Sequence, residues 1–269
     1  PKQWSLLSHA LAFVDHSLVS AKDLRSLVLA VVHAHTGYYN MCQRNYQHRD
    51  LSIGNVLSMV DEPIKTKRFD IPNPNETQRE ILELCKKLDI NEHCTGFVID
   101  GLGDMAVTWE SYFTEEHVGT KSGTSEFMSS ALLDPLNKNY VHSPVDDYYS
   151  LYFLTQWACV FRDLSPEDKP KEPQHIQRLH MRLAGGLDSR DAATSTTITG
   201  TKLKAEEYGT FLVQAQPFLR KWYGSLQSLD NEWREMDASE RYNAKTFRDT
   251  ADRGFLSFLR VVASEWKLL

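Results

Sequence analysis

A short polar stretch at residues 46–59, YQHRDLSIGNVLSM, contains the side chains of this chain that are best suited to chemistry. Asp50 follows His48 and Arg49, and Asn55 comes five residues after the aspartate. A carboxylate on a short loop can accept a proton from a substrate hydroxyl if something fixes its orientation. A carboxamide oxygen can bind Mg²⁺ without adding charge. The residue types and their spacing therefore favour a general base beside a metal ligand.

A second carboxylate is needed to bridge a metal ion to phosphate. Asp100 ends the apolar stretch TGFVID, which has the composition of a strand. Asp50, Asn55 and Asp100 together are the parts for phosphoryl transfer, in which the protein mainly positions groups and neutralises charge. The alternative is a surface turn in which the polar side chains at residues 48–50 are merely solvated. The segments downstream favour the chemical interpretation.

The polar stretch lies between a predicted helix and a predicted strand. In residues 21–41 apolar side chains recur at helical spacing, and Asp23 suits the helix start. The stripe that this helix should bury consists of Leu24, Leu27, Val28, Val31, His35 and Tyr38. NVLSMV at residues 55–60 predicts a short strand, as TGFVID does at residues 95–100. Residues 76–90 predict a short amphipathic helix inside an insertion at about 60–94.

The second half of the chain is expected to be largely helical. Residues 101–143 are rich in Gly, Ser and Thr and predict a long ordered loop. Residues 146–161 are apolar enough for a helix buried on most of its surface. The polar residues 188–202 predict a connector, and helices follow at roughly 202–227 and up to the end of the chain. The last helix should bury Phe255, Phe258, Leu259, Val262 and Trp266. The whole is expected to be mainly helical with a few short strands.

Composition excludes several classes of protein. Apolar residues at 41% and charged residues at 25% are typical of a globular protein. The formal charge of −6 gives no positive field, so nucleic acid is not the expected partner. No apolar run has the length of a membrane span, so no membrane association is expected. The cysteines are few and irregularly spaced, which predicts reduced thiols and an intracellular protein, cytoplasmic or nuclear: Cys42, Cys85, Cys94 and Cys159.

Three segments resemble protein kinases. HRDLSIGN is similar to the kinase catalytic loop H-R-D-x-x-x-x-N. GTSEFMSSALL at residues 123–133 resembles the segment that follows a kinase activation loop, and VDDYYSLYFLTQW resembles the buried kinase helix that begins D-x-x-S, with Asp147 and Ser150 in those places. The serine after HRDL, the glycine before Asn55, FMS and DDxxS are similar to the fungal-type protein kinase family. The resemblance covers about residues 20–165.

The resemblance implies the helical C-terminal lobe of the protein-kinase-like α+β fold. Residues 1–165 would form the core of this lobe with the catalytic loop, the activation segment and the insertion. Residues 166–269 would form its remaining helices and an extension.

The resemblance also implies roles for individual residues. Asp50 would be the catalytic base, and His48 would support the loop by packing and hydrogen bonding. Asn55 and Asp100 would hold Mg²⁺ on the phosphates of ATP. Asp147, at a helix start, would accept hydrogen bonds from backbone N–H groups of the catalytic loop.

Arg49 would face the activation loop, where a phosphate on Thr120 or Ser122 could pair with it. The alternative is that these two hydroxyls belong to plain loop residues. Thr124 would lie beside Asp50 and shape the site for a peptide substrate.

The pattern departs from kinases in four places. No Gly-rich loop or strand lysine precedes His48, so nucleotide binding by the chain alone is expected to be weak, and a partner or an N-terminal lobe would cover the face left open. Gly101 and Leu102 follow Asp100 in place of Phe-Gly, which makes Asp104 a competing metal ligand. Ala131 occupies the place of a kinase glutamate, and Ser52 that of a lysine.

Three functions are compatible with these residues. The first is an ATP-dependent protein serine/threonine kinase acting on a protein substrate. The second is a pseudokinase or scaffold that binds a partner protein without catalysis. The third is a small-molecule phosphotransferase, which shares the spacing of aspartate and asparagine but does not need the segments GTSEFM and DDYYS.

Overall fold

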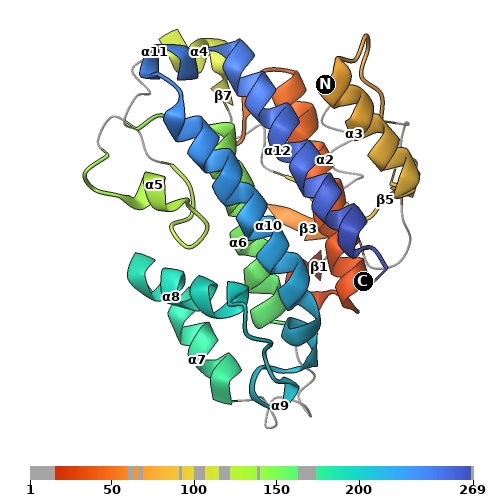
Figure 1. Ribbon diagram of the computed structural model, residues 1–269, viewed down its shortest axis with the longest axis vertical. Helices are drawn as coiled ribbons and strands as arrows, with labels where there is room; N and C mark the ends of the chain where they lie inside the picture. Colours follow the sequence, from red (N-terminus) through yellow and green to blue (C-terminus); the bar gives the residue numbers. More distant parts are fainter. Residues whose placement is uncertain are drawn as a thin grey trace, which may run out of the picture.

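Helices make up most of the structure, which is a computed structural model (Figure 1). It describes residues 16–59, 64–65, 69–90, 93–99, 107–114, 122–137, 140–162 and 174–267. The arrangement is that of the mainly helical, kinase-like C-terminal lobe expected from the sequence.

Helix α2 (Leu24–Gln43) begins where the sequence predicts. The side chain of Asp23 accepts a hydrogen bond of 2.7 Å from the backbone N–H of Ser26, which satisfies one of the free donors of the first turn. The helix ends before Asn45, whose φ of 63° is a left-handed conformation that asparagine tolerates well. The chain then turns into β2 (Tyr46–Gln47) and the polar stretch.

The polar stretch ends in a small antiparallel sheet, which contains its residues 56–58. Its strands are β1 (His16–Ser17), β3 (Val56–Ser58) and β6 (Gly96–Val98), in the order β1-β3-β6. In β3 and β6, Val56 pairs with Val98 and Ser58 with Gly96. A Cβ atom on Gly96 would lie 2.1 Å from the carbonyl oxygen of Ala30 in α2. Only glycine therefore lets β6 approach the helix this closely.

Two further strand pairs lie outside this sheet. Strand β2 pairs with β7 (Val107–Thr108), and β4 (Ile64–Lys65) pairs with β5 (His93–Cys94).

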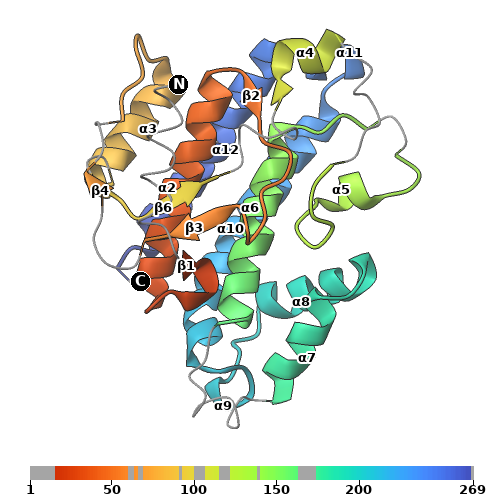
Figure 2. The ribbon, with the colours of Figure 1, turned by 180° about the vertical axis from the view of Figure 1, so that it is seen from behind.

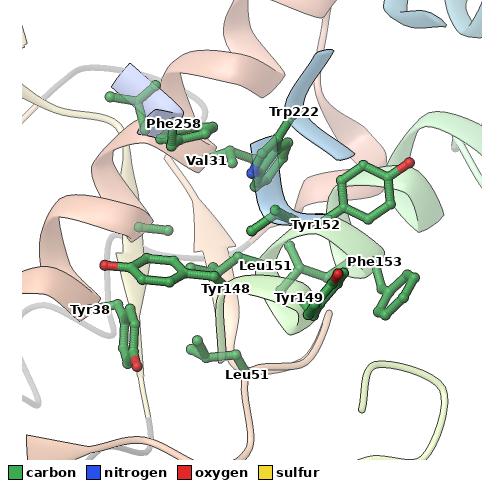
Figure 3. Close-up of a cluster of buried hydrophobic side chains, with 14 of the residues drawn as sticks. Val31, Tyr38, Leu51, Tyr148, Tyr149, Leu151, Tyr152, Phe153, Trp222 and Phe258 are labelled. Atoms are coloured by element: carbon green, nitrogen blue, oxygen red, sulfur yellow. The ribbon is translucent and has the colours of Figure 1, made fainter. Parts of the chain in front are cut away.

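Helix α6 (Pro144–Val160) runs through the middle of the lobe (Figure 2). Every side chain of α6 except that of Trp157 is buried, as its apolar sequence predicts. It packs against α2, α10 (Thr210–Glu235) and α12 (Ala244–Glu265). Trp222 of α10 and Phe258 of α12 reach the same cluster (Figure 3). Full burial of side chains of this size stabilises the fold by roughly 1.5–3 kcal/mol each.

The insertion helix α3 (Glu76–Lys87) is joined to the lobe by a buried carboxylate. Asp252 of α12 accepts hydrogen bonds from Tyr39 at 2.6 Å and Gln43 at 2.8 Å on one oxygen, and from Asn75 at 3.3 Å and Gln78 at 3.0 Å on the other. These donors come from α2 and from the start of α3, so one side chain connects three helices.

The predicted polar connector at 188–202 is wrong, because α8 (Leu187–Ile198) occupies most of it. Its buried face includes Thr194 and Thr197, which hydrogen-bond Gln156 of α6 at 3.2 and 2.6 Å. A helix whose buried face is polar shows no apolar periodicity, and this hid α8 in the sequence.

The remaining helices are short or lie at the two ends of the lobe. They are the 3₁₀ turn η1 (Leu18–Ser20), α7 (Gln174–Leu183), α9 (Ala205–Tyr208) and α11 (Ala238–Arg241). Figure 1 shows α7, α8 and α9 at the opposite end from α11. The helix expected at roughly 202–227 is α9 followed by the longer α10.

The long loop predicted at 101–143 also contains regular structure. Within its described residues lie β7, α4 (Trp109–Thr114) and α5 (Ser130–Leu133). Both large aromatic side chains Trp109 and Tyr112 are buried, which anchors α4 in the lobe. In the described part of the chain, no helix combines the length and the apolar character needed to cross a membrane.

Candidate catalytic site

The carboxylate of Asp50 is held by a residue 74 positions further along the chain. Its Oδ1 accepts hydrogen bonds from the backbone N–H of Thr124 at 2.8 Å and from the Thr124 hydroxyl at 2.9 Å. The Asn55 side-chain nitrogen donates to the Asp50 carbonyl oxygen at 2.8 Å and lies 3.3 Å from Oδ2. Both carboxylate oxygens therefore have an orienting partner, which is what a general base requires.

The amide group of Asn55 is oriented by these contacts. Because its nitrogen faces Asp50, its carbonyl oxygen Oδ1 is the atom suited to a cation. A neutral oxygen of this kind is a ligand that Mg²⁺ accepts.

The ring of His48 fastens the catalytic loop to the end of β6. Its Nδ1 accepts the backbone N–H of Asp50 at 3.3 Å, so Nε2 carries the proton and donates to the carbonyl oxygen of Ile99 at 2.9 Å. The N–H of Ile99 in turn donates to the carbonyl oxygen of Asn55 at 2.9 Å. The residue that precedes Asp100 in the sequence is thus bound to the loop that carries Asp50 and Asn55. Asp100 and Asp104 lie outside the described residues, and their roles stay predictions.

Asp147 lies buried beneath the loop in the first turn of α6. Its Oδ2 accepts the backbone N–H groups of His48 at 3.2 Å and Arg49 at 3.3 Å, and the side chain of Gln47 at 2.7 Å. Its Oδ1 pairs with Nε2 of His142 at 2.9 Å. Burial alone would raise the pKa of Asp147, but these partners, His142 foremost, hold it below its ordinary value.

Arg49 has a φ of 70° and is buried, with its guanidinium 5.3 Å from the ring centroid of Tyr112 in α4. The guanidinium thus lies at cation–π distance from an aromatic ring of α4, while its expected pairing with a phosphate on Thr120 or Ser122 stays a prediction. Thr120 lies outside the described residues. Ser122 is described and half-buried, next to Gly123.

Gly123 is a residue of the site that the sequence reasoning missed. Its φ is 123°, and a Cβ atom there would lie 2.8 Å from the carbonyl oxygen of Arg49. Glycine therefore lets the segment touch the catalytic loop and brings the next residue, Thr124, to Asp50. Its signal in the sequence was the dipeptide Gly-Thr at the start of GTSEFM.

Arg190 of α8 is a second residue that was missed. Its Nη1 donates to the carbonyl oxygens of Ser125, Glu126 and Met128 at 3.3, 3.4 and 2.5 Å, and its guanidinium lies 4.2 Å from the ring centroid of Phe153. Burial lowers its pKa below the ordinary value for arginine. It holds the segment after Thr124 through hydrogen bonds to backbone carbonyl oxygens. Because every residue has such an oxygen, no sequence motif predicts these contacts.

A cavity of about 380 Å³ lies between α5, α6 and α10. Ala131 and Arg234 both line it, and Arg234 pairs with Asp230 one turn earlier at 2.9 Å.

The metal ligands expected from the sequence are the carboxamide oxygen of Asn55 and the carboxylate of Asp100. Within the described residues, no group of three His, Cys, Asp or Glu side chains could hold a metal ion. Asn55 offers a hard oxygen of the kind that Mg²⁺ prefers, and Mg²⁺ is commonly held by one or two protein groups together with phosphate.

Comparison with the curated proteins and with the solved structures gave no match. A model of the fungal protein kinase family matches residues 10–159, which is 150 of the 269 residues and more than half of the chain. The matched part contains the catalytic loop, Thr124 and nearly all of α6. The chain belongs to the fungal protein kinase family.

Proposed function

We propose that the protein is an ATP- and Mg²⁺-dependent protein serine/threonine kinase with Asp50 as its catalytic base. The observation that carries this proposal is the orientation of the Asp50 carboxylate by Thr124 and Asn55. In a surface turn with solvated side chains, water would bind the carboxylate. Here Thr124 and Asn55, from two different segments, donate three hydrogen bonds to it.

In the proposed reaction, a hydroxyl oxygen of the substrate forms a bond to the γ-phosphorus of ATP. The bond from that phosphorus to the bridging oxygen breaks, ADP leaves, and the hydroxyl proton passes to Asp50. The hydrogen bonds from Thr124 to Oδ1 fix the orientation of the whole Asp50 carboxylate, so the carboxylate stays aligned with the hydroxyl of the substrate. Since this transition state needs little covalent help from the protein, alignment of the hydroxyl is the main contribution of Asp50.

The nucleotide phosphates would be held at the same loop. The carbonyl oxygen of Asn55 and the carboxylate of Asp100 would bind Mg²⁺, which neutralises charge on the phosphates when bound. Support comes from the bonds of Ile99 to His48 and Asn55, because they tie the residue before Asp100 to the loop.

A protein substrate is favoured by the segment that contacts Asp50. Residues 123–133 resemble the part of protein kinases that lies beside the peptide substrate, and Thr124 within this segment touches the base directly. A phosphotransferase for small molecules would not need it there.

The proposal is tested with the complete protein, [γ-³²P]ATP and a mixture of protein substrates. We expect label on serine and threonine in the presence of Mg²⁺ and no label after EDTA, because the metal is needed on the phosphates. Phosphoamino-acid analysis identifies the acceptor. Absence of label in Mg²⁺ would contradict the kinase and leave the partner-binding scaffold, whereas label on a small molecule alone would indicate the phosphotransferase.

A further inference from the structure

His142 is a buried histidine that the proposed mechanism does not use directly. It precedes α6, and its ring nitrogen Nε2 lies 2.9 Å from Oδ1 of Asp147. Both side chains are almost fully buried, with exposed fractions of 2% for His142 and 0% for Asp147. The remaining three donors to this carboxylate, Gln47 and the N–H groups of His48 and Arg49, all bind Oδ2. His142 therefore supplies the contact that fixes the other oxygen.

The position of His142 is set by a third segment. Its backbone N–H donates to the hydroxyl of Tyr112 in α4 at 2.6 Å. Nδ1 of the ring has no hydrogen-bond partner among the described residues, so the side chain forms its hydrogen bond through Nε2. A histidine in which one nitrogen alone is used can be replaced by a residue that offers a single donor at the same place.

The consequences of this contact reach the catalytic carboxylate. Burial of a carboxylate with an unpaired oxygen costs desolvation free energy, which favours the protonated, neutral form of the carboxyl group. A neutral or rotated Asp147 would be a poorer acceptor for the N–H groups of His48 and Arg49. The His48 ring accepts the N–H of Asp50 and donates to Ile99, so a shift of its backbone moves the base relative to the end of β6.

We propose that His142 is a positioning residue for phosphoryl transfer, which acts through Asp147 to hold the backbone of the catalytic loop. The proposal rests on the proposed function for its catalytic consequence. Its structural step, from His142 to the loop, does not depend on catalysis and can be measured separately.

The matched variants are His142→Leu, which removes the donor at similar size, and His142→Gln, whose side-chain nitrogen can reach the place of Nε2. Amide hydrogen exchange is followed in peptides from residues 46–59 and, as the reference, from α10. We expect His142→Leu to speed exchange in the catalytic loop at least tenfold relative to α10, and His142→Gln to restore slow exchange. Equal acceleration in both regions would mean a loss of global stability and would overturn the positioning role, as would an unchanged loop.

The kinetic arm uses the complete protein and steady-state phosphoryl transfer. For His142→Leu we expect kcat to fall about 10–100-fold, the size of the loss when a hydrogen-bonding partner that orients a metal ligand is removed. KM for ATP should stay within about twofold. His142→Gln should recover most of the rate. A fall in both variants alike, or a change confined to KM, would contradict the proposal. If the wild-type protein transfers no phosphate, the proposed function fails, and the exchange result still decides whether His142 positions the loop.

Discussion

Replacing Asp50 by asparagine should lower the rate of phosphoryl transfer by about 10²–10⁴-fold, the usual contribution of a positioned general base. Asparagine keeps the size of the side chain and an oxygen that can still accept the hydrogen bonds from Thr124. It cannot accept the proton of the substrate hydroxyl, and its nitrogen would face the nitrogen of Asn55, which now lies 3.3 Å from Oδ2. The loss should therefore appear in kcat, while the affinity for Mg·ATP stays within a few-fold.

A matched control separates this effect from a change in net charge. Asp70→Asn alters the same functional group at an exposed loop residue before α3, and it should leave the rate within twofold of the wild-type value. Unfolding midpoints in urea show whether either variant has lost stability. If Asp50→Asn transfers phosphate at a rate within about threefold of the wild-type protein, Asp50 is not the base.

The second large effect is a loss of stability in mild acid, to which buried His35 contributes. His35 lies on α2 in full burial, stacked on Phe258 with ring centroids 3.8 Å apart and packed against Trp222 at 5.1 Å. Burial lowers its pKa from 6.5 to about 3. Between those values the unfolded chain binds a proton that the native protein excludes, so the free energy of unfolding decreases as the pH falls below about 6.5.

The expected size follows from the width of that interval. Each pH unit costs about 1.4 kcal/mol for one such proton, so at about pH 4.5 His35 should account for roughly 3 kcal/mol. His35→Phe keeps an aromatic ring in the cluster and has no proton to bind. Its stability should equal that of the wild-type protein within about 1 kcal/mol at pH 7 and exceed it by roughly 3 kcal/mol at about pH 4.5.

Urea unfolding at several pH values measures this difference. His33, whose pKa burial lowers to about 4, titrates in both proteins, and its contribution cancels in the comparison. His16→Gln at an exposed position provides a control that should follow the wild-type curve. Stability curves for wild type and His35→Phe that stay parallel from pH 7 to about 4.5 would show that His35 does not resist protonation.

The parts of the fold that could be predicted are those whose determinants are local. The helix now seen as α2 carries an apolar stripe and an N-terminal aspartate, and α6 is apolar almost throughout, so both can be recognised without any tertiary contact. The loop with Asp50 and Asn55 is likewise a contiguous motif. Its fixed spacing places both side chains on one short segment, which allowed the candidate base and metal ligand to be named.

What could not be predicted depends on contacts between distant segments. Helix α8 cannot be recognised from apolar periodicity because its buried face contains Thr194 and Thr197. The hydroxyl groups of both residues hydrogen-bond Gln156 of α6. Arg190 contacts backbone carbonyl oxygens, which any sequence would offer. His142 lies in an irregular stretch just before α6, and its role becomes visible because its ring and the backbone of the catalytic loop both bind the carboxylate of Asp147.

The need for glycine at two positions was also invisible. Gly96 and Gly123 are required because a backbone carbonyl of another segment passes where their Cβ atoms would be. The residues beside Gly96 give no sign of that approach, and the Gly-Thr dipeptide at residue 123 does not show which segment comes close. The sequence thus allowed the reacting groups to be proposed, whereas the elements that hold them together emerged from the tertiary structure.

The central claim is that the catalytic loop and the end of β6 bind the same magnesium–nucleotide complex. A double-mutant cycle on the affinity of the complete protein for Mg·ATP, measured by calorimetry with Asn55→Ala, Asp100→Ala and the double variant, tests it most directly. Two ligands of one ion should be strongly coupled, so the double variant should bind little more weakly than the weaker single variant. Losses that simply add, or single variants that bind as tightly as the wild-type protein, would show that these residues do not share a site.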